Sequence, residues 1–142
     1  MQHQDEVGVT SKAKLWAGRV ITVFTVAFLF FDTMVKVLNL PVAVEGTARL
    51  GYPAGLVMCI GIVELVCLGA YLYPRTAVLG AILLTGYLGG AVATYVRIGE
   101  WYPPLVPFTT AVLAWLGVFL REPRLWTLLP LRRREPQPLQ PD

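Results

Sequence analysis

The sequence contains few side chains that could bind a metal ion or a redox cofactor. Its one histidine is His3, near the N-terminus, and its two cysteines, Cys59 and Cys67, do not form a C-x-x-C motif. Their spacing corresponds to about 12 Å of helix, whereas the Cα atoms of a disulfide lie within roughly 7 Å of each other. Met34 and Met58 are isolated thioethers, which make a poor metal site. We therefore expect no haem, no metal and no disulfide, and a membrane thiol oxidase is disfavoured.

Charged residues are also scarce, and this indicates a membrane protein. They make up 15% of the 142 residues and hydrophobic residues make up 56%, against about 25% charged and 45–50% apolar in soluble domains. Most hydrophobic residues fall in four segments, 15–38, 54–73, 76–96 and 103–120. Each is about 17–25 residues long, which is the length that a helix needs to cross the hydrocarbon layer. The sequence predicts an all-α, integral membrane four-helix bundle in a single membrane domain, 1–142.

The ends and connections of the four segments refine this prediction. A cleaved signal peptide does not fit the first segment, which is too long for the usual apolar core and contains Asp32 and Lys36. The turn at 73–75 is so short that the second and third segments must be antiparallel neighbours. Pro41 and Gly51 suit the start and the end of a short interfacial helix between the first two segments, which we expect on the outer membrane face. Disorder is expected in both tails, 1–12 and 134–142.

The basic residues predict how the protein is oriented. Four spans put both termini and the 73–75 turn on one side, where nine of the twelve Lys and Arg residues fall. Because basic residues gather on the cytoplasmic side, we expect a multi-pass protein of the bacterial cytoplasmic (inner) membrane with both termini in the cytoplasm. The net charge of +3 then reflects this orientation, and no nucleic-acid partner is expected. Residues 132–134 could instead bind anionic lipid headgroups.

Four ionisable residues lie inside or at the ends of the predicted spans. Glu64 is in the middle of an apolar run, where an acidic side chain costs roughly 2.5–3.5 kcal/mol to insert. Asp32 and Lys36 are one helical turn apart, so their side chains can meet. We expect Glu64 to be protonated or hydrogen-bonded to Lys36, Arg97, Thr94 or a tyrosine hydroxyl. Two interpretations stay open: an ion-pair network that fixes helix packing, or a polar pocket that binds a headgroup, a quinone or a proton.

The third span is rich in glycine. Gly80, Gly86, Gly89 and Gly90 lie in it, and Gly86 and Gly90 form a G-x-x-x-G pair, which lets another helix backbone come close. We expect these glycines to pack against helices of the same bundle. A dimer face, or a cofactor lying on the bare backbone, is the alternative.

Several stretches of the sequence resemble the DoxX-like family of small bacterial membrane proteins: 50–53, 60–65 with Cys67, and 73–91. Asp32 and Lys36 match the acidic and basic positions of the first helix of that family, and 121–125 matches the charged end of the fourth. One position departs from the family, which usually reads A-T-H-x-R where this chain has Ala93-Thr94-Tyr95-Val96-Arg97. If that histidine binds a ligand or moves protons, Tyr95 must do so differently or not at all.

The resemblance implies a four-helix membrane bundle, consistent with the four apolar segments. It also implies a link to sulfur-compound oxidation coupled to quinone, or to accessory subunits of oxidative-stress assemblies. One hypothesis is a protein that binds a quinone or lipid-like ligand as an accessory component of a membrane redox system, with a partner subunit supplying the electrons. The candidate ligand-binding residues are Asp32, Lys36, Glu64, Thr94, Tyr95 and Arg97.

The second hypothesis is a scaffold or assembly subunit that docks a membrane oxidoreductase subunit, or a second copy of itself, through the glycine-rich third helix. A transporter ranks lowest, because no internal repeat is visible and inverted repeats are expected there. The sequence alone does not decide whether the protein is an enzyme.

Overall fold

A computed structural model describes residues 2–121 and 125 of the chain. The elements are α1 (Gln2–Val37), α2 (Pro41–Arg49), the 3-10 helix η1 (Ala54–Leu56), α3 (Val57–Leu72), α4 (Ala77–Arg97) and α5 (Leu105–Arg121). All regular structure in the described part of the chain is helical, so the predicted all-α fold class is confirmed. The helix expected between the first two spans is α2.

The helices have the length and composition of a membrane protein. Three stretches are long and apolar enough to cross a membrane, Lys12–Val37, Ala54–Leu72 and Ala77–Arg97, and α5 is a shorter apolar helix. Large apolar side chains such as Phe24, Val66 and Phe108 are exposed on the outside of the bundle. Hydrocarbon can cover such a surface, whereas water would solvate it poorly. The chain is therefore a multi-pass membrane protein that contacts lipid.

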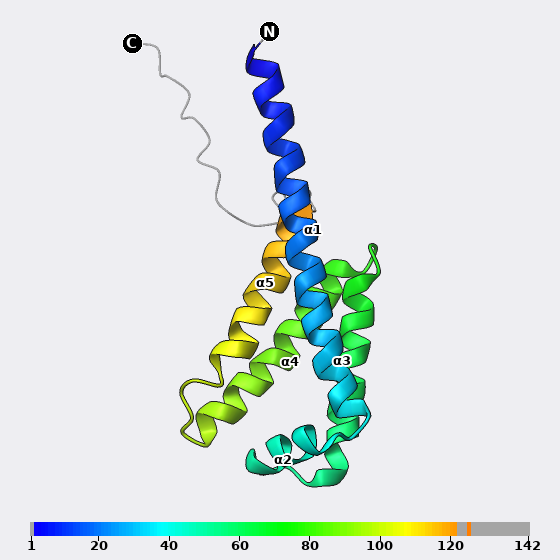
Figure 1. The fold of residues 1–142 in the computed structure, drawn as a ribbon, viewed down its shortest axis with the longest axis vertical. Coiled ribbons are helices and arrows are strands. Elements are labelled where there is room, and N and C mark those ends of the chain that lie inside the picture. Colours follow the sequence, from blue (N-terminus) through cyan, green and yellow to red (C-terminus); the bar gives the residue numbers. More distant parts are fainter. Residues whose placement is uncertain (1, 122–124, 126–142) are drawn as a thin grey trace, which may run out of the picture.

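The four long helices form a ring in which each packs against two others (Figure 1). α1 contacts α3 and α5, and α4 contacts the same two helices, so α1 and α4 lie diagonally opposite. Polar contacts cross both diagonals: Lys36 on α1 donates to the Tyr87 hydroxyl on α4 over 3.0 Å, and the Tyr71 hydroxyl on α3 donates to the Ala114 carbonyl on α5 over 2.9 Å. α2 and η1 lie together at one end of the bundle, the α2 end.

Helix ends differ from the sequence prediction at two places. α1 begins at Gln2, and its N-terminal part extends past the other helices, where a disordered tail was expected (Figure 1). Residues 2–12 contain no proline, and Gln, Glu and Lys among them are good helix formers, so the helix can continue through them. α5 begins at Leu105, two residues later than expected, after Pro103 and Pro104. The other expected tail, 134–142, and residues 132–134 lie outside the described residues.

Four glycines allow the helices of the bundle to approach closely. A Cβ atom added at any of them would come within 3 Å of a neighbouring helix: Gly18 against Leu120, Gly61 against Lys36, Gly80 against Tyr71, and Gly117 against Thr22. Only one of these, Gly80, belongs to the set predicted from the sequence. The others were missed because they lie outside the glycine-rich third span.

The remaining glycines of the third span do not pack inside the bundle. Gly86, Gly89 and Gly90 are exposed, and no described atom within 4 Å would meet a Cβ atom added to any of them. This corrects the expectation that they face helices of the same chain. Gly89 lines a hollow with residues of α5, and Gly90 lines another with Ile60 of α3, so both border open space and not a packed helix. The bare backbone is therefore available to something outside the described chain.

Candidate functional site

A group of polar side chains around one buried glutamate links three helices toward the α2 end of the bundle. Its centre is Glu64 on α3, whose side chain is 0% exposed. Glu64 Oε2 accepts hydrogen bonds from Lys36 Nζ on α1 and from the Tyr87 hydroxyl on α4, each over 2.9 Å. Lys36 also donates to Asp32 Oδ2, one turn earlier on α1, over 2.5 Å. We call Asp32, Lys36, Glu64 and Tyr87 the polar cluster. Glu64 therefore has the hydrogen-bond partners that a carboxyl group in the middle of an apolar helix needs.

Local sequence explains why these side chains meet. Asp32 and Lys36 are an i,i+4 pair on one face of α1. Gly61 lies one turn before Glu64 on α3, and a Cβ atom added there would meet Lys36 Cβ at 2.9 Å. The missing side chain lets α1 approach α3 closely enough for the lysine to reach Glu64. Tyr87 reaches the same point from α4, because the short turn at 73–75 folds α4 back along α3.

The hydrogen bonding of the polar cluster is incomplete on the acceptor side. A lysine ammonium group has three N–H donors, and those of Lys36 go to Asp32, Glu64 and Tyr87. Two carboxyl groups thus share one fully used cation. Glu64 Oε1 is buried and has no partner among the described residues, and the same is true of the Thr33 hydroxyl on α1. Because buried polar atoms normally have partners, Glu64 Oε1 marks the point where the hydrogen bonding of the cluster is short of a donor.

One hollow lies beside the polar cluster on the side of α2, and we call it the α2 chamber. It has a volume of about 250 Å³, and its polar wall is made by Lys36, Thr47, Tyr52, Tyr87 and Thr94. The Tyr52 and Thr94 hydroxyls share a hydrogen bond of 3.1 Å. Its remaining wall consists of Leu50, Ile60, Gly90 and Ala91.

A second hollow lies on the other side of the Asp32–Lys36 pair, and we call it the Asp32 hollow. It has a volume of about 220 Å³ and is lined by Asp32, Tyr95 and Thr110 among otherwise apolar residues. The Asp32 side chain is 42% exposed, whereas that of Lys36 is 20% exposed. Ala91 lines both this hollow and the α2 chamber. The polar cluster is thus flanked by space on two sides.

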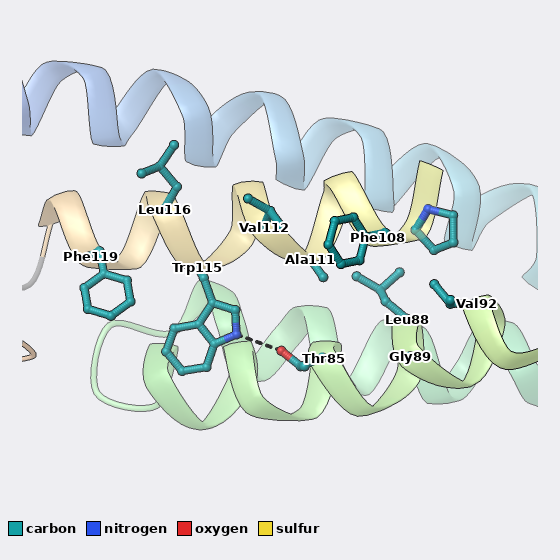
Figure 2. Close-up of a pocket in the computed structure, with 11 residues that line it drawn as sticks. Thr85, Leu88, Gly89, Val92, Phe108, Ala111, Val112, Trp115, Leu116 and Phe119 are labelled. Atoms are coloured by element: carbon teal, nitrogen blue, oxygen red, sulfur yellow. Dashed lines mark hydrogen bonds between the residues drawn. The ribbon is translucent and has the colours of Figure 1, made fainter. Parts of the chain in front are cut away.

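A third hollow is an apolar groove between α4 and α5, the α4–α5 groove (Figure 2). Its volume is about 470 Å³. Trp115 projects from α5 toward α4, and its indole N–H donates to the Thr85 hydroxyl over 2.8 Å. Trp115 therefore fills space between helices, and it also forms one wall of the groove.

The residues proposed from the sequence are only partly brought together. Asp32, Lys36 and Glu64 are in the polar cluster, Thr94 lines the α2 chamber, and Tyr95 lines the Asp32 hollow. Arg97 does not reach Glu64.

The Arg97 guanidinium donates instead to the Leu50 carbonyl over 3.0 Å, which ties the end of α4 to the end of α2. Sequence reasoning did not single out Tyr87, although a signal was present. Glu64 and Tyr87 stand at nearly equal distances before and after Arg75, the last residue of the turn, so antiparallel helices bring them to the same depth.

The described part of the chain contains no group of three or more His, Cys, Asp or Glu side chains that could hold a metal ion. Cys59 is exposed and Cys67 is buried, and both are free thiols. The chemistry that the polar cluster can offer is therefore that of carboxyl, ammonium and phenol groups: hydrogen bonding and proton binding.

The sequence model of the DoxX-like family matches residues 20–117, which include the whole polar cluster and most of the three hollows. No curated protein and no solved structure matches the chain.

Proposed function

The chain belongs to the DoxX-like family, and from this premise we propose that it binds the polar head of a quinone or lipid-like ligand at the polar cluster. The supporting observation is a fully buried glutamate, hydrogen-bonded to Lys36 and Tyr87, in a cluster with space on two sides. Ionisable groups at membrane depth are costly and mark ligand or proton sites more often than other positions do.

A purely structural role accounts for less of the geometry. An ion pair that only joins helices is best served when every buried polar atom is paired, yet Glu64 Oε1 and the Thr33 hydroxyl have no partner among the described residues. A close-packed helix contact would also leave little space beside Lys36 and Asp32, whereas each lines a hollow of more than 200 Å³. Ligand binding accounts for the two hollows, which a purely structural ion pair would not need.

The proposed role is that of an accessory component in a membrane redox system. The polar cluster can hold a headgroup and bind a proton, and a partner oxidoreductase subunit would carry the electron transfer. We place the protein in the bacterial inner membrane with both termini in the cytoplasm, on the distribution of Lys and Arg residues.

The test is extraction of the purified protein. Full-length chain is isolated in mild detergent, extracted with organic solvent, and analysed for quinones and lipids per protein molecule. We expect one ligand per chain in the wild type, and loss of most of it in Glu64→Gln. Glu45→Gln is the matched control, because Glu45 is an exposed glutamate on α2. Equal ligand in wild type and Glu64→Gln, or none in the wild type, contradicts the proposal.

A scaffold is the second candidate function, because the exposed face at Gly86 has no described neighbour. Small residues four apart let a helix from another subunit, or from a second copy of this chain, approach closely. Gly86→Leu tests this role, since Gly86 lines none of the three hollows. Loss of a partner, or of a homo-oligomer, from detergent pull-downs of Gly86→Leu but not of Glu64→Gln would favour the scaffold.

A further inference from the structure

Two of the hollows described above are neighbours, and one of them leads away from the polar cluster. The Asp32 hollow and the α4–α5 groove share Leu88 and Pro107 in their walls. From Pro107 to Phe119 the groove follows twelve residues of α5, which is about 18 Å of helix. A ligand with its head at Asp32 thus has a long channel for a tail.

The walls of the α4–α5 groove are largely apolar, so a hydrocarbon tail can pack against them. Thr85 and Trp115 are the polar residues of this groove, and both are satisfied. The Trp115 indole donates to the Thr85 hydroxyl, and that hydroxyl donates to the Ala81 carbonyl, each over 2.8 Å. The other lining residues are apolar, and Gly89 leaves the α4 backbone bare there. No polar atom of the groove therefore requires a partner from a ligand, and a linear apolar tail fits.

The head of such a ligand must donate a hydrogen bond. Asp32 Oδ2 accepts from Lys36, and the other carboxylate oxygen has no hydrogen-bond partner among the described residues. The side chain is 42% exposed, so a ligand in the hollow can reach it. The three N–H donors of Lys36 are already used. The hollow thus offers an acceptor and no free ammonium, in a cluster with two carboxyl groups for one cation. Anionic heads are disfavoured by this charge balance, and hydroxyl donors are favoured.

The Asp32 hollow also fits an aromatic ring. Its volume is about 220 Å³, and a cavity of roughly 150 Å³ is enough to bind benzene. Phe28, Tyr95 and Pro103 contribute flat apolar surface to its wall. Offset or edge-to-face contact with such side chains favours an aromatic head over an open-chain alcohol.

We infer that the ligand is a long-tailed hydroquinone, whose ring lies in the Asp32 hollow, whose hydroxyl donates to Asp32, and whose tail lies in the α4–α5 groove. This inference rests on the proposed function and specifies its ligand and its entrance. The α2 chamber is less suitable for this ligand. The walls of this chamber include Thr47 and Leu50 from the α2 region, and Tyr52 and Thr94, which are hydrogen-bonded to each other. The chamber shares no wall residue with the α4–α5 groove, so it offers no neighbouring space for the tail.

The experiment measures binding of a hydroquinone with a decyl tail, kept reduced without oxygen, and of the matching quinone. The protein is the full chain in lipid nanodiscs. We expect the hydroquinone to bind about tenfold more tightly than the quinone, because the quinone head has no donor for Asp32. Gly89→Leu should weaken hydroquinone binding by about tenfold, because the new side chain fills the groove. Gly86→Leu is the matched control and should stay within about twofold of wild type.

Each outcome decides the inference. Equal affinity for the quinone and the hydroquinone, or wild-type binding in Gly89→Leu, overturns it. If Gly90→Leu weakens binding and Gly89→Leu does not, the ligand lies in the α2 chamber, so this inference fails while the proposed function stands. If wild type binds neither form and its organic extract holds no quinone or lipid, both fail.

A second measurement does not depend on the folding of a glycine variant. A decyl hydroquinone with bromine at the end of its tail should quench the fluorescence of Trp115, which lines the groove. The quenching should fall to background in Trp115→Phe, whereas Trp101→Phe, in the exposed α4–α5 connection, should keep it. Quenching that is the same in Trp115→Phe as in wild type overturns the placement of the tail.

Discussion

Lys36 is the side chain on which the polar cluster depends, because its ammonium group donates to all of its three neighbours. Lys36→Met keeps most of the side-chain length and removes the charge, which leaves two carboxyl groups without a cation. Breaking a buried ion pair on one side costs about 3–5 kcal/mol, so we expect a loss of about 3 kcal/mol in the free energy of unfolding. The measurement is unfolding in detergent, with Lys14→Met, at an exposed position of α1, as control.

Partial rescue separates the loss of a charge partner from a general packing defect. In the double variant Lys36→Met/Glu64→Gln the buried carboxylate is also removed, so the combined loss should be at least about 1 kcal/mol smaller than the sum of the single losses. Strictly additive losses would show that Lys36 and Glu64 do not stabilise each other. The measurement is the thermal midpoint of unfolding, in one detergent, of the wild type, the two single variants and the double variant.

At the scale of the helices, two glycines of α4 that look alike in the sequence have opposite surroundings. Gly80 lies on the Tyr71 backbone of α3, whereas Gly86 has open space around it. Gly80→Ala should therefore destabilise the bundle by about 1–3 kcal/mol through overpacking. Gly86→Ala should be neutral or stabilise it by up to about 1 kcal/mol, because alanine is the better helix former. Equal effects of the two substitutions on the unfolding midpoint would contradict the packing described here.

The same pair shows how far the sequence could predict the structure. Apolar segments of membrane-crossing length predicted the helices, and the i,i+4 spacing predicted that Asp32 and Lys36 would meet. Gly86 matched a motif for helix contact, and yet it faces open space. A glycine pattern indicates where a backbone can be approached, but the partner is decided by how helices rotate about their axes, which depends on the packing of all of them.

The polar cluster was predictable to a similar extent. Glu64 required a partner because of its depth, and Lys36 on another helix was one of the candidates. Arg97 was another, but its guanidinium goes to the Leu50 carbonyl, because α4 carries it beyond the level of Glu64 to the end of α2. Tyr87 could have been found by pairing positions across the turn at 73–75. The hollows could not be predicted, since they depend on which small side chains of α4 stay uncovered.

At the scale of the whole molecule, the polar cluster and the hollows both depend on the diagonal placement of α1 and α4 in the bundle. α1 and α4 do not pack directly along their lengths, and the polar cluster joins them across the diagonal through Lys36 and Tyr87. On both sides of this connection α4 presents small residues, Gly89 toward the groove and Gly90 and Ala91 toward the chamber. A hydrogen-bonded polar link thus lies next to bare helix backbone, which is the arrangement that the proposed ligand site requires.

The orientation of this molecule gives the last prediction. If α4 crosses the membrane, the turn at Arg75 and the connection at Glu100 lie on opposite sides, because they flank the two ends of this helix. From the excess of basic residues on its side, we predict that Arg75 lies in the cytoplasm. Single cysteines are introduced as Arg75→Cys or Glu100→Cys after replacement of Cys59 and Cys67 by alanine. In spheroplasts, a membrane-impermeant maleimide should label Glu100→Cys at once and Arg75→Cys only after lysis. The reverse pattern would invert the proposed topology, and immediate labelling of both would mean that α4 does not span the bilayer.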